Sequence, residues 1–340
     1  MKELTSAQNS KYILDLLNKN KKKIPSPYNK LAKIATSQKI RDYKFKGIKT
    51  KLMQYEGITA TGKTVKFYSH YSSEKTRKFL TQWLFLDYLS QKGFLEPPLL
   101  VPKPIIFIKK DNLFIREDVQ GEAVLKHLKN NEPQDLREIL GLSAQWLLKL
   151  QKLKIKDKSI FTPVSDIEKE EFDHYLKVGC ARFSAKSCNK IRKVLSVINK
   201  HTSSYNAKNK SSTLIHGDFQ PTNVIYTEGL KHLTTIDFDW SGIGDPLSDV
   251  GNFIFQLEYH SSQHLTQTEI LKYKKMFLDV YFKKEPTEQE ERRINIYQAK
   301  FAIQRVIFNA EFLIPKTLKP EDDPTVKNLI KQAIQNVAKL

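Results

Sequence analysis

The sequence predicts an α+β protein of two lobes, with an antiparallel sheet and one helix in the N-terminal lobe and a larger, mainly helical C-terminal lobe. Strand-like runs fill residues 43–71, and amphipathic helical patterns prevail after residue 121. The chain has 340 residues, of which 40% are apolar, and can therefore bury one large core or two modest ones. We place the lobe boundary after residue 119, so that the C-terminal lobe spans residues 120–340.

The N-terminal lobe is predicted to begin with a helical appendage over residues 1–40. Within it, apolar side chains recur at helical spacing at Tyr12, Ile13, Leu16 and Leu17. Two strand-like runs follow within residues 43–71, separated by a turn rich in Gly and Thr at residues 57–62. These runs predict the start of the antiparallel sheet.

The helix of this lobe is expected between residues 74 and 91. Its apolar residues recur every three or four positions, as on the buried side of an amphipathic helix: Phe79, Trp83, Leu86 and Leu89. The apolar runs IIFIKK and NLFIRED then follow a proline-rich stretch and are typical of a hairpin.

Helical patterns account for most of the C-terminal lobe, most clearly over residues 132–153 and 273–313. Ser165 and Glu168 have the spacing of a capping box ahead of another helix. The acidic residues within 166–173 fit the first turn of that helix, where negative charge meets the helix dipole. The alternative is that they line a pocket for a cationic substrate.

Basic residues outnumber acidic ones and give a formal net charge of +20. Such a charge raises the local concentration of acidic or phosphorylated partners without identifying one. Lysines are scattered along nearly every segment instead of clustering with aromatic residues, which argues against nucleic-acid binding. A basic RNA-associated binding protein is kept as an alternative.

The two cysteines, Cys180 and Cys188, are too few for a disulfide framework and lack metal-ligand spacing. The N-terminal residues lack the apolar core of a signal peptide, and no run approaches the ~18 apolar residues needed to span a bilayer. The sequence therefore predicts a cytoplasmic protein without a membrane span.

The most informative segment is LIHGDFQPTNVIYTEGLKHLTTIDFDWSGIGDPLSDVGNF, residues 214–253. Phosphoryl transfer to a hydroxyl group needs a carboxylate that accepts the proton of the nucleophile, and oxygen ligands that hold magnesium against a triphosphate. Asp218 can serve the first purpose, and Asn223 with Asp237 the second. The spacing of Asp218 and Asn223 lets both leave one loop toward one site, and a short hairpin is expected to bring Asp237 beside them.

The pair HGDFQPTN and IDFDWSGIGDPLSD resembles the signature of the aminoglycoside phosphotransferase family, which includes choline, homoserine and sugar kinase relatives and has a fold similar to protein kinases. The resemblance implies that Asp218 is the catalytic base and that Asn223 and Asp237 are metal ligands. It also implies that His216 supports the catalytic loop and that Asp245 orders the loop after the metal-binding strand.

Several of these residues also fit plain structural roles. His216 fits a buried, hydrogen-bonded histidine. Asp245 and Asp249 fit ordinary residues of a helix N-terminus. Asp239 would face the same side as Asp237 if the strand continued, where it could approach a second metal or the substrate, or make a structural hydrogen bond.

The resemblance further implies a phosphate-binding lysine on the third strand of the N-terminal lobe, and Lys66 in TVKFYS is the candidate. In the family, the following helix carries a glutamate that pairs with this lysine. The corresponding residue here is Gln82, with Glu74 as an alternative glutamate nearer the helix start. A neutral amide cannot form an ion pair with the lysine, although it can hydrogen-bond to it. There is also no G-x-G-x-x-G motif, because Gly47 and Gly57 stand alone.

The segment FIREDVQGEAV resembles the family's link between the lobes, where main-chain groups from Glu117 to Val119 would meet the nucleotide base. Because main-chain groups make these contacts, the side chains do not distinguish ATP from GTP.

We therefore expect a small-molecule kinase that uses Mg2+ and ATP or GTP to phosphorylate a hydroxyl group of a small metabolite, such as a sugar or an amino alcohol. A strongly basic chain matches a polycationic aminoglycoside poorly. The rival prediction is a nucleotide-binding pseudokinase without turnover, which Gln82 and the sparse glycines favour. The sequence does not indicate an oligomeric state.

Overall fold

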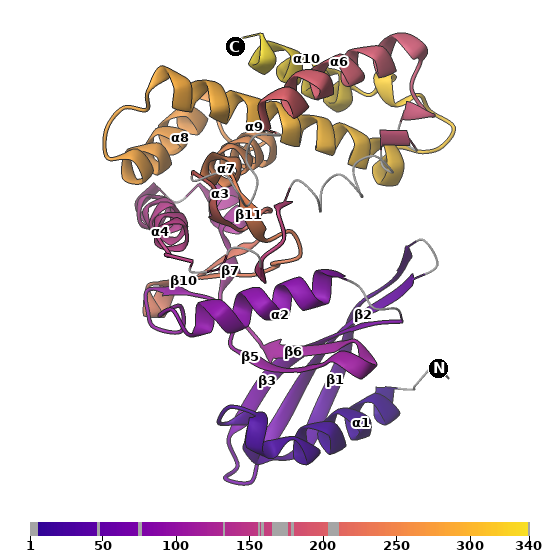
Figure 1. Cartoon of the computed structure of the whole chain (residues 1–340), viewed down its shortest axis with the longest axis vertical. Coiled ribbons are helices and arrows are strands. Elements are labelled where there is room, and N and C mark those ends of the chain that lie inside the picture. Colours follow the sequence, from indigo (N-terminus) through magenta and orange to yellow (C-terminus); the bar gives the residue numbers. More distant parts are fainter. Residues whose placement is uncertain are drawn as a thin grey trace. The chain divides into compact units, whose positions relative to one another are not determined.

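The computed structural model describes residues 6–45, 48–73, 77–131, 133–155, 157, 160–164, 176–177, 180–202 and 211–338. It divides into two compact units (Figure 1). The first unit contains residues 1–121 and Thr234–Asp239, and the second contains Glu122–Leu233 and Trp240–Leu340. The expected boundary after residue 119 assigned residues 234–239 to the second lobe, whereas the structure groups them with the first unit. No helix within the described residues is long and apolar enough to cross a membrane.

The first unit is built on a five-stranded sheet in the order β1-β2-β3-β6-β5, in which all neighbouring strands are antiparallel. The strands are β1 (Leu31–Phe45), β2 (Ile48–Thr59), β3 (Thr64–Ser72), β5 (Pro104–Ile108) and β6 (Leu113–Glu117). The predicted antiparallel sheet and the β5–β6 hairpin are therefore confirmed. Gly57 was expected in a turn but lies within β2, where a Cβ would come 2.2 Å from Leu31 Cδ2.

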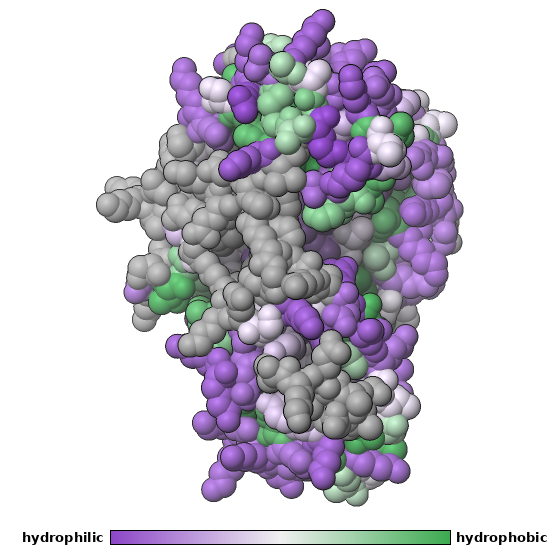
Figure 2. Space-filling model, turned by 90° about the vertical axis from the view of Figure 1, so that its right-hand side faces the viewer, coloured by the Kyte–Doolittle hydropathy of each residue, from purple (hydrophilic) through white to green (hydrophobic). Residues whose placement is uncertain are grey.

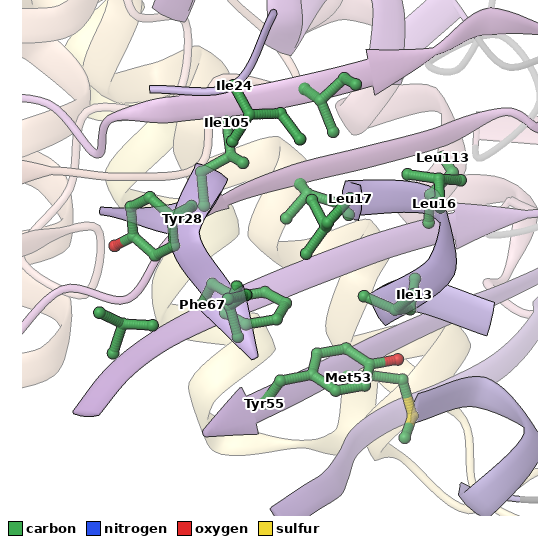
Figure 3. Packing of buried hydrophobic residues seen from close by; sticks show 14 residues of the cluster. Ile13, Leu16, Leu17, Ile24, Tyr28, Met53, Tyr55, Phe67, Ile105 and Leu113 are labelled. Carbon is green, nitrogen blue, oxygen red and sulfur yellow. The ribbon is translucent and has the colours of Figure 1, made fainter. Parts of the chain in front are cut away.

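The N-terminal helix is an integral part of this unit. The helix predicted from Tyr12, Ile13, Leu16 and Leu17 is confirmed as α1 (Ser6–Lys19), but it ends well before β1 begins at Leu31, so a helical appendage does not extend over residues 1–40. The side chains of Ile13 and Leu17 are 3% and 1% exposed and pack with Phe67 of β3 in one apolar cluster (Figure 3). One face of the sheet therefore needs α1 to shield it from water.

The helix α2 (Arg77–Ser90) lies against the opposite face of the sheet (Figure 1). Its Trp83 stacks on Phe107 of β5 and meets Phe114 of β6 edge to face. Side chains alternate between the two faces of a strand, so Phe114 points toward α2 while its neighbour Ile115 points toward α1. The helix predicted between residues 74 and 91 is confirmed.

The second unit is mainly helical, as predicted. Its helices are α3 (Val124–Asn130), α4 (Pro133–Gln151), α6 (Ala185–Thr202), α7 (Pro246–Ser261), α8 (Gln267–Phe282), α9 (Glu288–Phe308) and α10 (Pro324–Val337). Its short strands are β7 (Glu122–Ala123), β8 (Thr213–Ile215), β9 (Val224–Thr227) and β11 (Gly242–Gly244), while β10 (His232–Thr235) runs from the second unit into the first.

The core of this unit forms around α9, which packs against α6, α7 and α10. Gly251 permits the close approach of α7 to α9, because a Cβ there would lie 2.5 Å from Tyr297 Cβ. Two strand pairs, β7 with β9 and β8 with β11, are antiparallel and frame the segment between β8 and β9. That segment contains the sequence HGDFQPTN.

On the face of the molecule drawn in Figure 2, hydrophilic residues cover most of the described surface, with apolar residues interspersed among them. This distribution matches the scattered charges of the sequence.

We expect Leu17→Ala to lower the free energy of unfolding by about 2–5 kcal/mol, because it leaves a cavity between α1 and the sheet. The same substitution at Leu84, which is 40% exposed on α2, should cost less than about 1 kcal/mol. Urea unfolding of both variants provides the measurement. Equal effects would show that α1 does not contribute to the core.

Candidate active site

The loop after β8 is held by one buried carboxylate. Asp249 of α7 accepts a hydrogen bond from the main-chain N–H of His216 at 2.7 Å and another from that of Gly217 at 2.9 Å. Burial raises the pKa of Asp249 to about 7, and these two donors act against the rise. Gly217 has a φ of +80°, and a Cβ there would lie 2.0 Å from the carbonyl oxygen of Trp240. The loop therefore requires both a glycine and this carboxylate.

Three side-chain amides donate to the carboxylate of Asp218. Gln220 Nε2 lies 2.9 and 2.8 Å from its two oxygens, Asn223 Nδ2 lies 2.9 Å from Oδ2, and Asn252 Nδ2 lies 3.2 Å from Oδ1. Burial raises the pKa of Asp218, while these donors and the nearby Arg305 oppose that rise. Because every neighbour donates, the group is oriented as a proton acceptor.

Asn223 is fixed at the end of the same loop. Its Nδ2 also donates to the main-chain oxygen of Asp218 at 2.9 Å, and its own N–H donates to the carbonyl of Gln220 at 2.8 Å. With Nδ2 engaged, Oδ1 is the end of the amide that can bind a metal ion. An amide oxygen is a hard ligand suited to magnesium.

His216 supports this loop from the protein interior. It is completely buried, packs edge to face against Trp146 and Phe219, and accepts a hydrogen bond at Nδ1 from the N–H of Asp218 at 3.3 Å. Ser241 Oγ donates to its main-chain oxygen at 2.8 Å. This environment suits a packing and hydrogen-bonding role.

Asp245 joins α7 to α9. Its carboxylate caps α7 by accepting from the N–H of Leu247 at 3.0 Å, and it also accepts from Arg293 and from the hydroxyl of Tyr297. Asp245 thus combines the expected helix cap with an ordering contact across the core.

Lys66 and Gln82 have different partners within the first unit. Lys66 Nζ lies 3.7 Å from Glu56 Oε2, directly across the β2–β3 register. Gln82 is 4% exposed and donates to Oδ1 of Asp239. The amide of Gln82 is therefore engaged with Asp239, while its role in binding the nucleotide stays a prediction.

The segment Thr234–Asp239 contacts α2 at a second point, where Phe238 stacks on Phe85 with ring centroids 5.9 Å apart. Asp237 precedes this ring, is exposed, and has a φ of +67°, which a residue other than glycine seldom adopts. β10 ends at Thr235, so strand alternation does not place Asp239 beside Asp237. Asp237 belongs to the first unit and Asn223 to the second, and their approach stays a prediction.

Arg116 of β6 lies near Asp237 and was not singled out from the sequence. It is 8% exposed, and its guanidinium lies 4.8 Å from the ring centre of Tyr68. Burial lowers the pKa of Arg116, and the charge of Asp237 is among those that oppose this fall. The signal in the sequence was an arginine directly after the apolar run LFI.

The segment expected to meet a nucleotide base has much of its main chain already bonded. The N–H of Glu117 donates to the carbonyl of Lys103 at 3.0 Å, and that of Asp118 donates to the carbonyl of Lys66 at 3.1 Å. Among residues 117–119, Val119 has no main-chain hydrogen bond within the described residues. The contact of Val119 with a nucleotide base stays a prediction, and Glu117 is bonded to Lys103, which directly precedes β5.

Some predictions fall outside the described residues. They concern Gly47, Glu74, the capping box of Ser165 with Glu168, and the acidic residues within 166–173.

Three further polar residues were not predicted from the sequence: Asn252 and Gln256 of α7 and Gln220 of the loop. The signal was available, because Asn252 and Gln256 interrupt an apolar helix one turn apart, where buried polar groups need partners.

Comparison with known families gives one match over most of the chain. Residues 58–281 match the family described as the phosphotransferase enzyme family. No curated protein matches the chain in sequence.

Solved structures of similar fold cover most of the chain at low sequence identity. They include an amicoumacin kinase in complex with AMP-PNP, Ca2+ and Ami, with a TM-score of 0.63, 14% identity and 88% coverage of each chain. An ADP-bound aminoglycoside phosphotransferase has a TM-score of 0.53, 17% identity, and coverage of 96% of this chain and 98% of that chain. The ethanolamine kinase of Plasmodium vivax has a TM-score of 0.58 and 13% identity, with coverage of 99% of this chain and 91% of that chain. The two-lobed kinase-like fold is confirmed.

We expect Gly217→Ala to destabilise the protein by at least about 1–2 kcal/mol from its backbone conformation alone, with a further cost from the collision with Trp240. Gly229→Ala is the matched control, since a Cβ there meets nothing within 4 Å. Thermal unfolding of both variants tests the prediction, and equal midpoints would contradict it.

We expect Gln82→Glu to lower the free energy of unfolding by about 1–3 kcal/mol, because it buries a second carboxylate against Asp239. Gln91→Glu is the control, because Gln91 also donates to an aspartate, Asp87, but at an exposed position, where the cost should stay below about 0.5 kcal/mol. Urea unfolding compares the two. A stabilising effect at residue 82 would instead indicate pairing with Lys66.

Proposed function

Because the chain belongs to the phosphotransferase enzyme family, we propose that it transfers the γ-phosphoryl group of ATP or GTP to a hydroxyl group of a small metabolite. The observation that carries this proposal is the environment of Asp218, whose two oxygens are held by three amides in the proton-accepting state. The adenine nucleotides bound to the similar structures support ATP as a donor.

In the proposed reaction, the hydroxyl oxygen of the acceptor forms a bond to the γ-phosphorus while the bond from that phosphorus to the β,γ-bridging oxygen breaks. The hydroxyl proton passes to the carboxylate of Asp218, and the nucleoside diphosphate leaves with the electron pair of the broken bond. The amides of Gln220, Asn223 and Asn252 fix the carboxylate in position, which contributes to the rate through orientation.

We propose Asn223 Oδ1 and the carboxylate of Asp237 as ligands of Mg2+. Both are hard oxygen donors, and the engagement of Asn223 Nδ2 with Asp218 directs the amide oxygen away from that residue. When bound, the ion neutralises charge on the triphosphate. Arg116 is positioned to counter the charge of Asp237 within the first unit.

For the donor nucleotide we propose Val119 as the main-chain contact of the base and Lys66 as the phosphate ligand. Lys66 is half-exposed and its ion pair with Glu56, at 3.7 Å, is a weak surface pair that a phosphate can displace. We further propose a cytoplasmic location, which the free thiols of Cys180 and Cys188 support.

Loss of turnover is the second candidate, since Gln82 stands where the family has a glutamate and donates to Asp239, while Lys66 pairs with Glu56. The intact network around Asp218 favours the active enzyme.

The first experiment is thermal unfolding with and without MgATP or MgGTP, because a ligand of the native state raises its stability. We expect a magnesium-dependent rise in the wild type that Asp237→Ala abolishes and Asp218→Asn retains. The surface variant Asp42→Ala is the matched control and should behave as the wild type.

Turnover completes this test, measured as nucleoside diphosphate released in the presence of hydroxyl acceptors. Asp218→Asn should lower it by about 10²–10⁴-fold, the usual contribution of a general base. Nucleotide binding without turnover in the wild type would identify a pseudokinase, and no binding of either nucleotide would overturn the proposal.

A further inference from the structure

Arg305 of α9 has an unusual environment next to the proposed catalytic base. Its Nη2 donates to Oε1 of Gln256 at 3.1 Å, and its guanidinium lies 5.0 Å from the ring centre of Tyr259 and 5.4 Å from that of Phe308. Within the part of the chain that the structure describes, no carboxylate forms a salt bridge with it. A partly buried guanidinium is therefore held by one amide oxygen and two aromatic rings.

Such an environment leaves most of the hydrogen-bonding capacity of Arg305 unused. A guanidinium has five N–H donors arranged to bind a carboxylate or phosphate in bidentate geometry. Arg305 makes a single hydrogen bond, to Gln256, within the described residues. Aromatic faces stabilise the cation without neutralising it.

The position of Arg305 follows from α7. Asn252 of this helix donates to Asp218 Oδ1 at 3.2 Å, and Gln256, the residue that accepts from Arg305, follows four positions later. Residues four apart in a helix lie on the same face, about one turn or 5–6 Å apart. The guanidinium is therefore about one helical turn from the contact with the proposed base. Burial raises the pKa of the Asp218 carboxyl, and the charge of Arg305 opposes that rise.

Positive charges and buried polar atoms of other side chains lie near Arg305. Burial, followed by the charges of Arg305 and Lys129, lowers the pKa of His260 to about 4. His260 Nε2 and Asn252 Oδ1 are buried and have no hydrogen-bond partner among the described residues. A ligand that donates to Asn252 would satisfy one of these groups.

We propose that the acceptor carries an anionic group, a carboxylate or a phosphate, which binds Arg305 while the acceptor hydroxyl lies at Asp218. The inference rests on the proposed function and adds the substrate class. The separation of about one helical turn suits a small metabolite with the two groups a few bonds apart. The net charge of +20 further favours the approach of anionic acceptors.

The test compares matched acceptors at saturating MgATP. The carboxylate arm pairs serine with ethanolamine, glycerate with glycerol, and gluconate with glucose, and the phosphate arm pairs ribose 5-phosphate with ribose. We expect the anionic member of at least one pair to have a kcat/KM about tenfold or more above that of its partner, as for a charge-assisted hydrogen bond. The arm that responds identifies which anion is bound.

Variants of Arg305 on α9 separate an effect on binding of the acceptor from an effect on the proposed catalytic base, Asp218. Arg305→Gln should raise KM for the anionic acceptor about tenfold or more with little change in kcat, and should leave the neutral or cationic partner unchanged. Arg305→Lys should restore part of the loss, because it keeps the charge without the fork of donors. Arg292→Gln, the same change at an exposed position of α9, is the control and should match the wild type.

Three results would overturn this inference. They are a preference for the neutral or cationic acceptors, no turnover of any anionic acceptor, and an equal loss of kcat for all acceptors in Arg305→Gln. In those cases, a rise in the unfolding temperature with MgATP would still support the proposed kinase function. Absence of that shift would overturn the proposed function, and this inference with it.

Discussion

The pair of hydrogen bonds from the main chain of His216 and Gly217 to Asp249 determines much of the second unit, because it fixes the loop that carries Asp218 against the first turns of α7. The same helix then supplies Asn252 to the carboxylate of Asp218 and Gln256 to Arg305. One buried carboxylate thus sets the position of the loop relative to a helix, and that helix presents both a partner for the base and a contact for the proposed acceptor. The cost of burying the carboxylate is offset by its two N–H donors.

In the first unit, a comparable constraint joins α2 to the segment Thr234–Asp239. Gln82 donates to Asp239, and Phe85 stacks on Phe238 three residues further along the helix. An amide is suited to this position because it can donate to a carboxylate, whereas a glutamate would repel it. Gln82, which stands where the resemblance implies a glutamate, therefore has a partner of its own, and this partner lies one residue from Phe238 and two from Asp237.

The positive charge of the whole chain is diffuse, whereas the charges near the proposed site are placed at particular residues. Over the whole chain, lysines give a diffuse excess of positive charge. Locally, two buried or partly buried arginines are placed near carboxylates with proposed chemical roles, Arg116 near Asp237 and Arg305 near Asp218. Both guanidiniums rest against aromatic rings, which hold a cation without an ion pair. A guanidinium held in this way can still attract the negative charge of a bound nucleotide or acceptor.

The sequence alone determined the antiparallel sheet, the β5–β6 hairpin, α2, the helical second unit and the family, since these depend on local periodicity and on a motif of closely spaced residues. The tertiary structure decided that α1 belongs to the core, that Gln82 meets Asp239 instead of Lys66, and that Arg305 lies near Asp218. Periodicity reports which face of an element is apolar but not which element covers it. The partners Gln82 and Asp239 are 157 positions apart, and such contacts arise only when the chain folds.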